Sequence, residues 1–281
     1  MTTRPLEALV DTLEFTGERM VPEKADATNF WEHIYRYRFA SNFVRNKRVL
    51  DIACGEGYGT AALLEAGARS VVGVDICPAT CEHAHRKYGV DARVGSVDQI
   101  PLPDRSIDVI VSFETIEHVQ EPATFLDECV RILAPGGMVI MSTPNGEVHH
   151  EAGIDNQFHL GELTEEEFMA LLSPRFTNWQ LFTQRPYSAA WWSIRSFAAT
   201  KPIWLRMRGA WRLFLKIREV VWSTLCPHIQ GEVDEQYREQ PVKITLSKDG
   251  RLSSFVNPYA VRKRARWSRE CAWYTVAVAR L

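Results

Sequence analysis

The sequence lacks the features that mark secreted and membrane-embedded proteins. No uninterrupted apolar stretch reaches the length of a transmembrane span. The N-terminal residues MTTRPLEALVDTLEF contain no apolar h-region, so we expect no signal peptide. The six cysteines are scattered and form no C-x-x-C pair, which favours a reduced, cytoplasmic protein with mostly buried thiols.

An excess of charge of one sign is also absent. The formal net charge is −2, which argues against a globally basic nucleic-acid binder and leaves local basic patches open. Internal repeats and low-complexity tracts are missing as well. With 281 residues, 46% of them hydrophobic, the chain can bury a full core, and one enlarged domain is expected rather than two.

The most informative stretch present is VLDIACGEGYG, residues 49–59. An apolar run ends at Asp51 and is followed by a loop with Gly55, Gly57 and Gly59. Glycine tolerates positive φ and lets the backbone approach a ligand closely. A helix starting near Tyr58 would turn its free N–H groups toward the same ligand. The pattern is typical of a nucleotide-binding α/β domain, although the loop alone also fits an ordinary tight turn.

A second acid strengthens the nucleotide-binding interpretation. Asp75 ends the next apolar run, VVGVD, 24 positions after Asp51. An acid at the end of the second strand is well placed to accept both ribose hydroxyls of a bound nucleoside.

Strands and helices are expected to alternate along the core. Strands are predicted near 48–53, 70–75, 91–94, 107–113 and 137–143, with Pro135-Gly136-Gly137 as a turn before the last of these, and further strands at 176–184 and 271–281. Helices are predicted near 30–44, 58–67, 78–88, 122–132 and 164–172. This alternation implies a parallel sheet covered on both faces, with ligands at the carboxyl ends of the strands.

At these motifs the sequence resembles the class I S-adenosylmethionine-dependent methyltransferases. VLDIACGEGYG is similar to their first motif and VVGVDI to their second, and the resemblance continues through IPLPDRSIDVIVSFETIEHV and ILAPGGMVIMSTPN, over residues 48–183. It implies an α/β fold with a Rossmann-like, seven-stranded, doubly wound sheet and S-adenosyl-L-methionine as methyl donor. The cofactor contacts it implies are Asp51, Ala53, Gly55, Gly57, Asp75, Ile76, Ser96 and Val97.

The third motif departs from the family pattern. Many members carry an acid for the adenine amino group, whereas this chain reads Gly95-Ser96-Val97-Asp98. Ser96 can still donate a hydrogen bond to adenine and Val97 can pack on the ring.

The resemblance divides the chain into four parts. Residues 1–47 are expected to form an N-terminal helical lid, 48–183 the cofactor-binding core, 184–270 a Trp- and Arg-rich insertion and 271–281 the closing strand. EFTGERMVPE (14–23) and EHIYRYRFA (32–40) resemble the N-terminal signature of methyltransferases encoded with glycan-modifying enzymes. On that basis Arg19, Tyr35 and Tyr37 are expected near the cofactor or the acceptor.

The insertion is unusual in composition. It holds six tryptophans, and its segment 201–219 contains six Lys or Arg and one acid. Its expected helices could pack on the core with a solvated basic stripe. They could instead cap an acceptor cleft, where Trp rings stack on sugars, or lie on an anionic membrane surface.

Three titratable residues follow the fourth predicted strand. Glu114, Glu117 and His118 stand at i, i+3 and i+4, so on one helical turn their side chains share a face. Two carboxylates beside an imidazole are costly unless they are solvated or hold a cation. The alternative is an acidic turn with a satisfied histidine.

A later H-x-x-E-x-T, from His159 to Thr164, extends this pattern. The first part, E-x-x-E-H, resembles the ubiquinone-biosynthesis O-methyltransferases, and both parts resemble the plant-type small-RNA 3′-end 2′-O-methyltransferases. The resemblance implies Mg2+, or Mn2+, held by Glu114, Glu117, His118 and His159 and bound to two vicinal hydroxyls of the acceptor. A cation there would lower the pKa of the hydroxyl to be methylated.

Catalytic roles are predicted for Glu117, His118 and His150. His118 is a candidate metal ligand or proton acceptor, and His150, beside His149, is a second candidate base.

The leading functional hypothesis is a metal-assisted O-methyltransferase acting on a sugar hydroxyl of a saccharide or glycosylated small molecule. The first alternative is 2′-O-methylation of an RNA 3′-terminal ribose, which the net charge of −2 makes the weaker hypothesis, and the second is a cofactor-binding subunit without methyl transfer. We expect a cytoplasmic protein, with the basic Trp-rich insertion as a candidate for peripheral membrane contact. The oligomeric state is not predicted.

Overall fold

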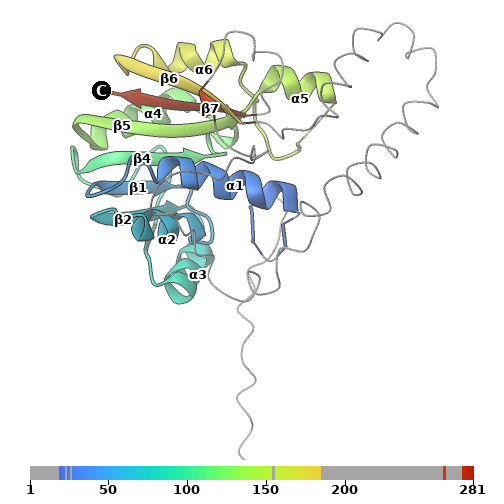
Figure 1. Cartoon of the computed structure of the whole chain (residues 1–281). Coiled ribbons are helices and arrows are strands. Elements are labelled where there is room, and N and C mark those ends of the chain that lie inside the picture. Colours follow the sequence, from blue (N-terminus) through green and yellow to red (C-terminus); the bar gives the residue numbers. More distant parts are fainter. Residues whose placement is uncertain (1–18, 23, 26, 154–155, 185–261, 264–273) are drawn as a thin grey trace, which may run out of the picture.

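A computed structural model of the chain describes residues 19–22, 24–25, 27–153, 156–184, 262–263 and 274–281 (Figure 1). The predicted insertion therefore lies outside the described residues apart from 184 and 262–263. Of the predicted N-terminal lid, residues 1–18 also lie outside them.

One mixed sheet forms the centre of the molecule. Its strands are β1 (Arg48–Ile52), β2 (Ser70–Asp75), β3 (Asp91–Val94), β4 (Ile107–Phe113), β5 (Leu133–Pro144), β6 (Asn178–Gln184), β7 (Arg262–Lys263) and β8 (Tyr274–Arg280). Their order is β3-β2-β1-β4-β5-β8-β6-β7. The first five are parallel, whereas β8 runs antiparallel between β5 and β6. The seven long strands confirm the predicted Rossmann-like, doubly wound α/β fold.

The helices cover both faces of this sheet. They are α1 (Ala27–Ala40), α2 (Tyr58–Glu65), α3 (Pro78–Tyr88), α4 (Pro122–Ile132), α5 (Gly146–Ala152) and α6 (Glu165–Leu172), with a short 3-10 helix, η1, at Ile116–His118. One buried apolar cluster joins α1 and α2 to the sheet through residues such as Phe30, Leu63 and Val109. A second joins α4 and α6 to the opposite face through Phe125, Phe168 and Ile110.

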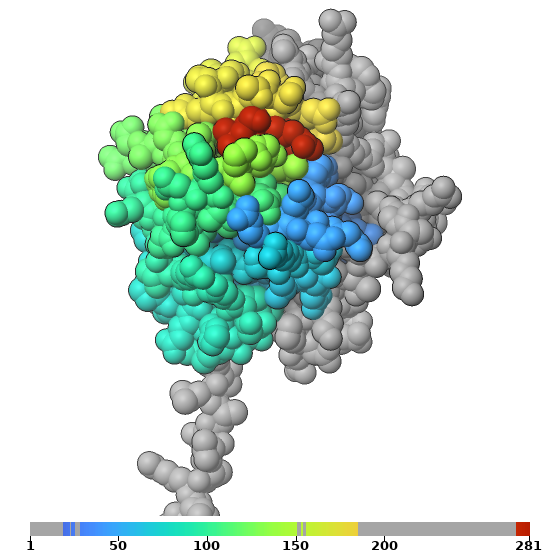
Figure 2. All heavy atoms as spheres, turned by 90° about the vertical axis from the view of Figure 1, so that its left-hand side faces the viewer, coloured from blue at the N-terminus to red at the C-terminus, as the bar shows by residue number. Residues whose placement is uncertain are grey.

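The inner strands are buried on both faces because their sequences are almost continuously apolar. Neighbouring residues of β4, such as Val109 and Ile110, belong to the two different core clusters. This pattern is expected for a parallel sheet covered by helices on both sides. Figure 2 views the end at which these parallel strands begin, and β8 (red) lies between the green and yellow elements on that side.

Three details of the elements differ from the sequence prediction. β5 begins at Leu133 and runs through Pro135-Gly136-Gly137, with Gly136 at φ +74° and an irregular register beside β4, so this turn signal is absorbed as a bulge. The segment carrying His149 and His150, which was expected to be a loop, is a helix, α5, whose first turn Asn145 caps by accepting a hydrogen bond from the Val148 N–H. A two-residue strand, β7, comes from within the predicted helical insertion.

In the part of the chain that the structure describes, no helix is both long enough and apolar enough to cross a bilayer.

Candidate functional site

Every second residue of the loop after β1 has a left-handed backbone conformation. Ala53, Gly55 and Gly57 have φ values of +59°, +55° and +95°, and only Ala53 among them carries a side chain. Gly57 also touches α3, since a Cβ built on it would lie 2.6 Å from the Ala84 Cβ. The loop thus has no side chains at positions 55 and 57, next to the start of α2, where free N–H groups favour an anionic or polar ligand.

Asp51 organises this loop from beneath. Its carboxylate is fully buried and accepts hydrogen bonds from Thr60 Oγ1 (2.7 Å) and the Tyr37 hydroxyl (3.1 Å). Burial raises the pKa of Asp51 to about 7, even though the two hydrogen bonds oppose the shift. The predicted cofactor residue Asp51 is therefore placed to hold the loop, with Tyr37 and Thr60 as its partners.

Asp75 ends β2 beside the same loop. Its two oxygens accept one backbone N–H each, from Gly55 and from Cys77, both at 3.0 Å. A carboxylate has about four acceptor positions, so these two bonds orient Asp75 and leave positions for two further donors. That arrangement suits the predicted pairing with two ribose hydroxyls.

The remaining predicted cofactor residues follow β2 and β3. Ile76 is 74% exposed, which is unusual for a large apolar side chain and suits contact with a flat ring. The loop after β3 is tied to β2 by the Gly95 N–H, which donates to the Asp75 carbonyl at 3.0 Å. Ser96 is half-buried, and Val97 packs against the second core cluster. The structure thus brings the ends of β1, β2 and β3 together at one edge.

The three residues of the N-terminal signature that were predicted near the cofactor or the acceptor have different surroundings in the structure. Arg19 lies beside the loop, with its Cγ 3.7 Å from the position of a Cβ on Gly55. Tyr37 is buried behind the loop, where its ring packs on Gly59. Tyr35 is half-buried, and its ring is tilted against that of Trp31.

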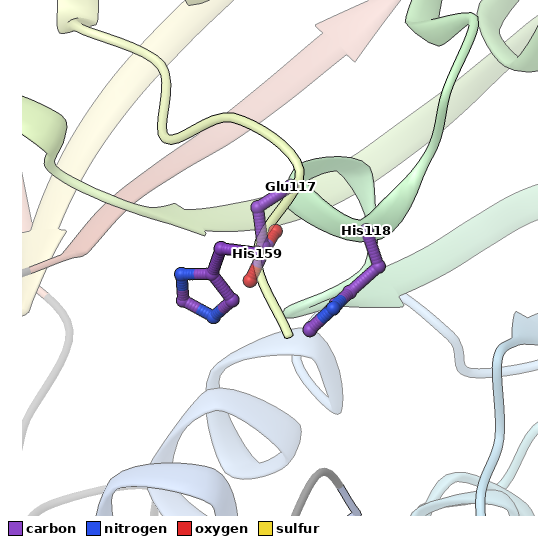
Figure 3. A group of neighbouring side chains, drawn as sticks. All are labelled: Glu117, His118 and His159. Carbon is purple, nitrogen blue, oxygen red and sulfur yellow. The ribbon is translucent and has the colours of Figure 1, made fainter. Parts of the chain in front are cut away.

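Three potential metal ligands converge at the end of β4. Glu117, His118 and His159 each offer one ligand atom, and these atoms lie within 4.8 Å of one another. Figure 3 shows the Glu117 carboxylate between the two imidazole rings. Backbone hydrogen bonds join the loop that carries His159 to η1, because the Leu160 and Gly161 N–H groups both donate to the Glu117 carbonyl.

Glu117 is the buried member of this group. One of its oxygens accepts a hydrogen bond from Thr143 Oγ1 at 3.3 Å, and the other, Oε1, has no hydrogen-bond partner among the described residues. Burial raises the pKa of Glu117 well above its ordinary value, and the nearby Glu114 adds to the shift. A buried carboxylate oxygen without a donor is a costly arrangement that a cation would relieve.

Both histidines are oriented as metal-binding histidines usually are. The Nδ1 of His118 lies 2.9 Å from the Phe158 carbonyl, and the Nδ1 of His159 lies 2.6 Å from a Glu162 oxygen. A proton on each Nδ1 satisfies these contacts and leaves both Nε2 lone pairs for other partners, although that of His159 also lies 2.9 Å from the Asn156 amide nitrogen. Two imidazoles beside one carboxylate are an atypical ligand set for Mg2+, which prefers oxygen ligands, and they suit Mn2+ better.

Glu114, the fourth predicted ligand, lies outside this group of three. It has φ +52° and precedes η1, so it does not share a helical turn with Glu117 as the spacing predicted. Its Oε1 accepts a hydrogen bond from Ser142 Oγ at 2.6 Å and lies 3.8 Å from the Arg36 guanidinium. Its role as a ligand stays a prediction.

The two adjacent histidines of α5 have different surroundings. His150 is exposed, whereas His149 is buried and its Nδ1 lies 3.0 Å from the same Glu162 oxygen that His159 contacts. Sequence reasoning named His150 as a second candidate base. It included Glu162 in the H-x-x-E-x-T pattern but gave no role to this carboxylate, which contacts both His149 and His159.

Comparison with known proteins identifies the core. The family model described as "Methyltransferase domain" matches residues 50–141. This part of the chain is a class I S-adenosylmethionine-dependent methyltransferase domain. A probable S-adenosylmethionine-dependent methyltransferase of Mycolicibacterium smegmatis is 41% identical over 174 residues, which are 60% of this chain and 66% of the relative.

Two further comparisons concern a curated protein and a solved structure. A ubiquinone biosynthesis O-methyltransferase of Maricaulis maris is 38% identical over 104 residues, 35% of this chain and 41% of that protein. A Thermotoga maritima crystal structure of a SAM-dependent methyltransferase, described as a possible histamine N-methyltransferase, has a TM-score of 0.55 at 14% identity and covers 92% of this chain and 91% of its own; it supports the fold alone. The chain spans about two thirds or less of the length of these curated relatives.

Proposed function

We propose that this protein is a metal-assisted O-methyltransferase that transfers the methyl group of S-adenosylmethionine to a sugar hydroxyl of a saccharide or glycosylated small molecule. The observation that carries the proposal is the group formed by Glu117, His118 and His159, whose ligand atoms lie within 4.8 Å of one another at the end of β4.

A divalent cation held by these three side chains would supply Lewis acidity toward two neighbouring hydroxyls and lower the pKa of one of them. This chemistry answers the main difficulty of O-methylation, since an alcohol keeps its proton near neutral pH. The sulfonium donor is already activated, so the remaining task of the protein is to hold the two reactants in line.

The chain's own residues divide these tasks between the two halves of the sheet edge. On the cofactor side, Asp75 and the backbone around Gly55 are oriented to bind the nucleoside and the amino-acid end of the donor. On the acceptor side, Glu162 and the Phe158 carbonyl fix the ring orientations of His159 and His118. Glu117, His118 and the exposed His150 remain the candidates for catalytic roles.

The saccharide acceptor has two supports. The first is the N-terminal signature, of which Arg19 lies beside the cofactor loop. The second is the fit of a cation site to vicinal hydroxyls, which saccharides supply. Similarity to a ubiquinone biosynthesis O-methyltransferase over residues of the core supports oxygen as the accepting atom.

The metal assignment is tested first by binding, without an acceptor. Titration of the full chain with Mn2+, followed by electron paramagnetic resonance, should reveal one tight site that is lost in Glu117→Gln and in His159→Gln. Glu121→Gln is the matched control, because Glu121 is an exposed acid on the segment that follows η1. Equal Mn2+ binding by Glu117→Gln and wild type would overturn the metal site.

Activity is tested with radiolabelled S-adenosylmethionine on a panel of saccharides with vicinal hydroxyls, with an oligoribonucleotide as an added arm. We expect transfer to a saccharide that EDTA abolishes and Mn2+ or Mg2+ restores. Full transfer in EDTA would refute the role of the metal while leaving methyl transfer intact. Transfer to the oligoribonucleotide alone would replace the saccharide by RNA.

A further inference from the structure

Helix α1 carries a fully buried arginine over the acceptor half of the sheet. Arg36 has no exposed surface. Its Nη1 donates to Gln184 Oε1 at 2.9 Å and lies 3.8 Å from Glu114, and its guanidinium carbon lies 4.4 Å from the centre of the Tyr274 ring. These contacts come from the ends of β4 and β6 and the start of β8. The cofactor acids, in contrast, end β1 and β2.

The other edge of this guanidinium has no hydrogen-bond partner among the residues that the structure describes. Both of its nitrogens, Nε and Nη2 of Arg36, are buried. Buried donors are nearly always satisfied, and a charged donor left unpaired is among the most costly exceptions. The empty edge therefore needs an explanation.

Elsewhere in the described chain the same edge of arginine binds carboxylates. Arg48 donates through Nε (3.1 Å) and Nη2 (2.7 Å) to the two oxygens of Asp108. Arg175 donates in the same way to Asp127, at 2.6 and 3.1 Å. This pairing of two parallel N–H groups with two oxygens is the strong, directional contact that guanidinium groups make with oxyanions.

We propose that the Nε and Nη2 of Arg36 bind a carboxylate or phosphate group of the acceptor, so that the acceptor is an acidic saccharide held at its charged group by α1 and at its hydroxyls by the metal ligands. The proposal rests on the proposed function for the saccharide nature of the acceptor. The contact between Arg36 and Glu114 is made through Nη1, at 3.8 Å, and not through the Nε and Nη2 edge.

Binding at this position has a structural consequence. Both nitrogens are buried in the free chain. An oxyanion can therefore reach them only if the groups packed around Arg36 move. The amides of α1 should then exchange hydrogen differently with an acidic ligand than with a neutral one.

The test compares matched probes. Calorimetry of the full chain with S-adenosylhomocysteine and EDTA present should give at least tenfold tighter binding of glucuronate or glucose 1-phosphate than of glucose. Arg36→Gln and Arg36→Lys should both lose this preference. Glutamine lacks the charge, and lysine keeps the charge but lacks the two parallel N–H groups, the fork, of the guanidinium. Arg38→Gln, a change on the half-exposed side of the same helix, is the control that should keep it.

Each other outcome counts against the proposal. Equal binding of glucose and both acids by the wild type overturns it, and so does full preference in Arg36→Lys, which would reduce Arg36 to a charge partner of Glu114. A loss of S-adenosylhomocysteine binding in the variants, with methylthioadenosine unaffected, would assign the fork to the carboxylate of the cofactor.

Two features of this design keep the result interpretable. If Arg36→Gln does not unfold cooperatively, the wild-type comparison and the hydrogen exchange of α1 still decide. EDTA removes any contribution of the metal, so a failed metal site cannot imitate a failed oxyanion site.

Discussion

At the scale of single residues, two glycines allow the effect of a left-handed backbone to be told apart from the effect of close packing. Gly57 has φ +95° and lies against Ala84, whereas Gly89 has φ +67° and nothing within 4 Å of a Cβ built on it. Alanine at either position takes on a backbone conformation that costs about 1–2 kcal/mol. Only at position 57 does it also force α2 and α3 apart.

We therefore expect Gly57→Ala to destabilise the protein by about 2–4 kcal/mol and to weaken cofactor binding, with Gly89→Ala costing about 1 kcal/mol. Urea unfolding and calorimetry with S-adenosylhomocysteine measure both effects. Equal losses in the two variants would contradict the packing role of Gly57.

Asp51 gives a prediction on pH. Its pKa of about 7 in the folded chain exceeds the unfolded value of about 3.9, so the folded state binds the proton more tightly. This contribution to stability is present below pH 4 and is lost as the pH rises through 7. Between pH 5 and pH 8 the wild type should lose about 2–3 kcal/mol relative to Asp51→Asn, which has no such proton. Urea titrations of both proteins at each pH would measure the difference. If the free energies of unfolding of the two proteins changed equally with pH, the prediction would be wrong.

At the scale of elements, the start of α6 fixes the loop that carries His159. Thr164 and Glu167 form a reciprocal capping box, in which the Thr164 hydroxyl accepts from the Glu167 N–H and the Glu167 carboxylate accepts from the Thr164 N–H. The residue before the cap is also tied, because the Gly146 N–H donates to the Leu163 carbonyl.

We expect Glu167→Ala to cost about 0.5–1 kcal/mol more than Glu166→Ala. Both are exposed glutamates in the first turn of α6, so the comparison removes the effect of charge near the helix terminus. Mn2+ affinity should fall in Glu167→Ala alone. Thermal unfolding of the two variants provides the measurement, and identical midpoints would show that the box does not stabilise the helix.

Elements whose signals are local could be predicted from the sequence. The bounds of β2, β3, β4, α3 and α4 agree with prediction, because apolar runs, Pro at helix starts and Gly89 at a helix end act within a few residues. The turn at Glu114 could not be predicted, since its positive φ depends on the backbone bond from its N–H to Ser142 of the neighbouring strand.

The candidate site follows the same division. The family resemblance implied a ligand set of Glu114, Glu117, His118 and His159, and the structure brings the last three together. The contact of His149 with Glu162, which His150 does not share, and the pairing of Arg36 with Gln184 both join segments that are apart in the chain. Such contacts have no local pattern.

At the scale of the whole molecule, β8 joins β6 to the five parallel strands of the described sheet. It pairs with β5 on one side and with β6 on the other, over seven residues each, and its Val276 and Ala277 belong to the two different core clusters. Without β8, β6 would lose its link to the parallel strands.

A chain ending at Trp273 is therefore expected to lose cooperative thermal unfolding, whereas a chain ending at Arg280 should keep it. Circular dichroism melting distinguishes the two. A cooperative transition in the shorter chain would mean that the parallel half of the sheet folds independently of the rest.

The convergence of Glu117 and His159 has a consequence for the folding equilibrium. The two residues are about 40 positions apart, so an ion bound between them acts as a removable cross-link that closes a long loop around α4, β5 and α5. Closing such a loop chiefly disfavours the unfolded chain. The protein would then hold its acceptor edge most firmly when loaded with metal, and a chelator would loosen that edge before it affected the cofactor edge.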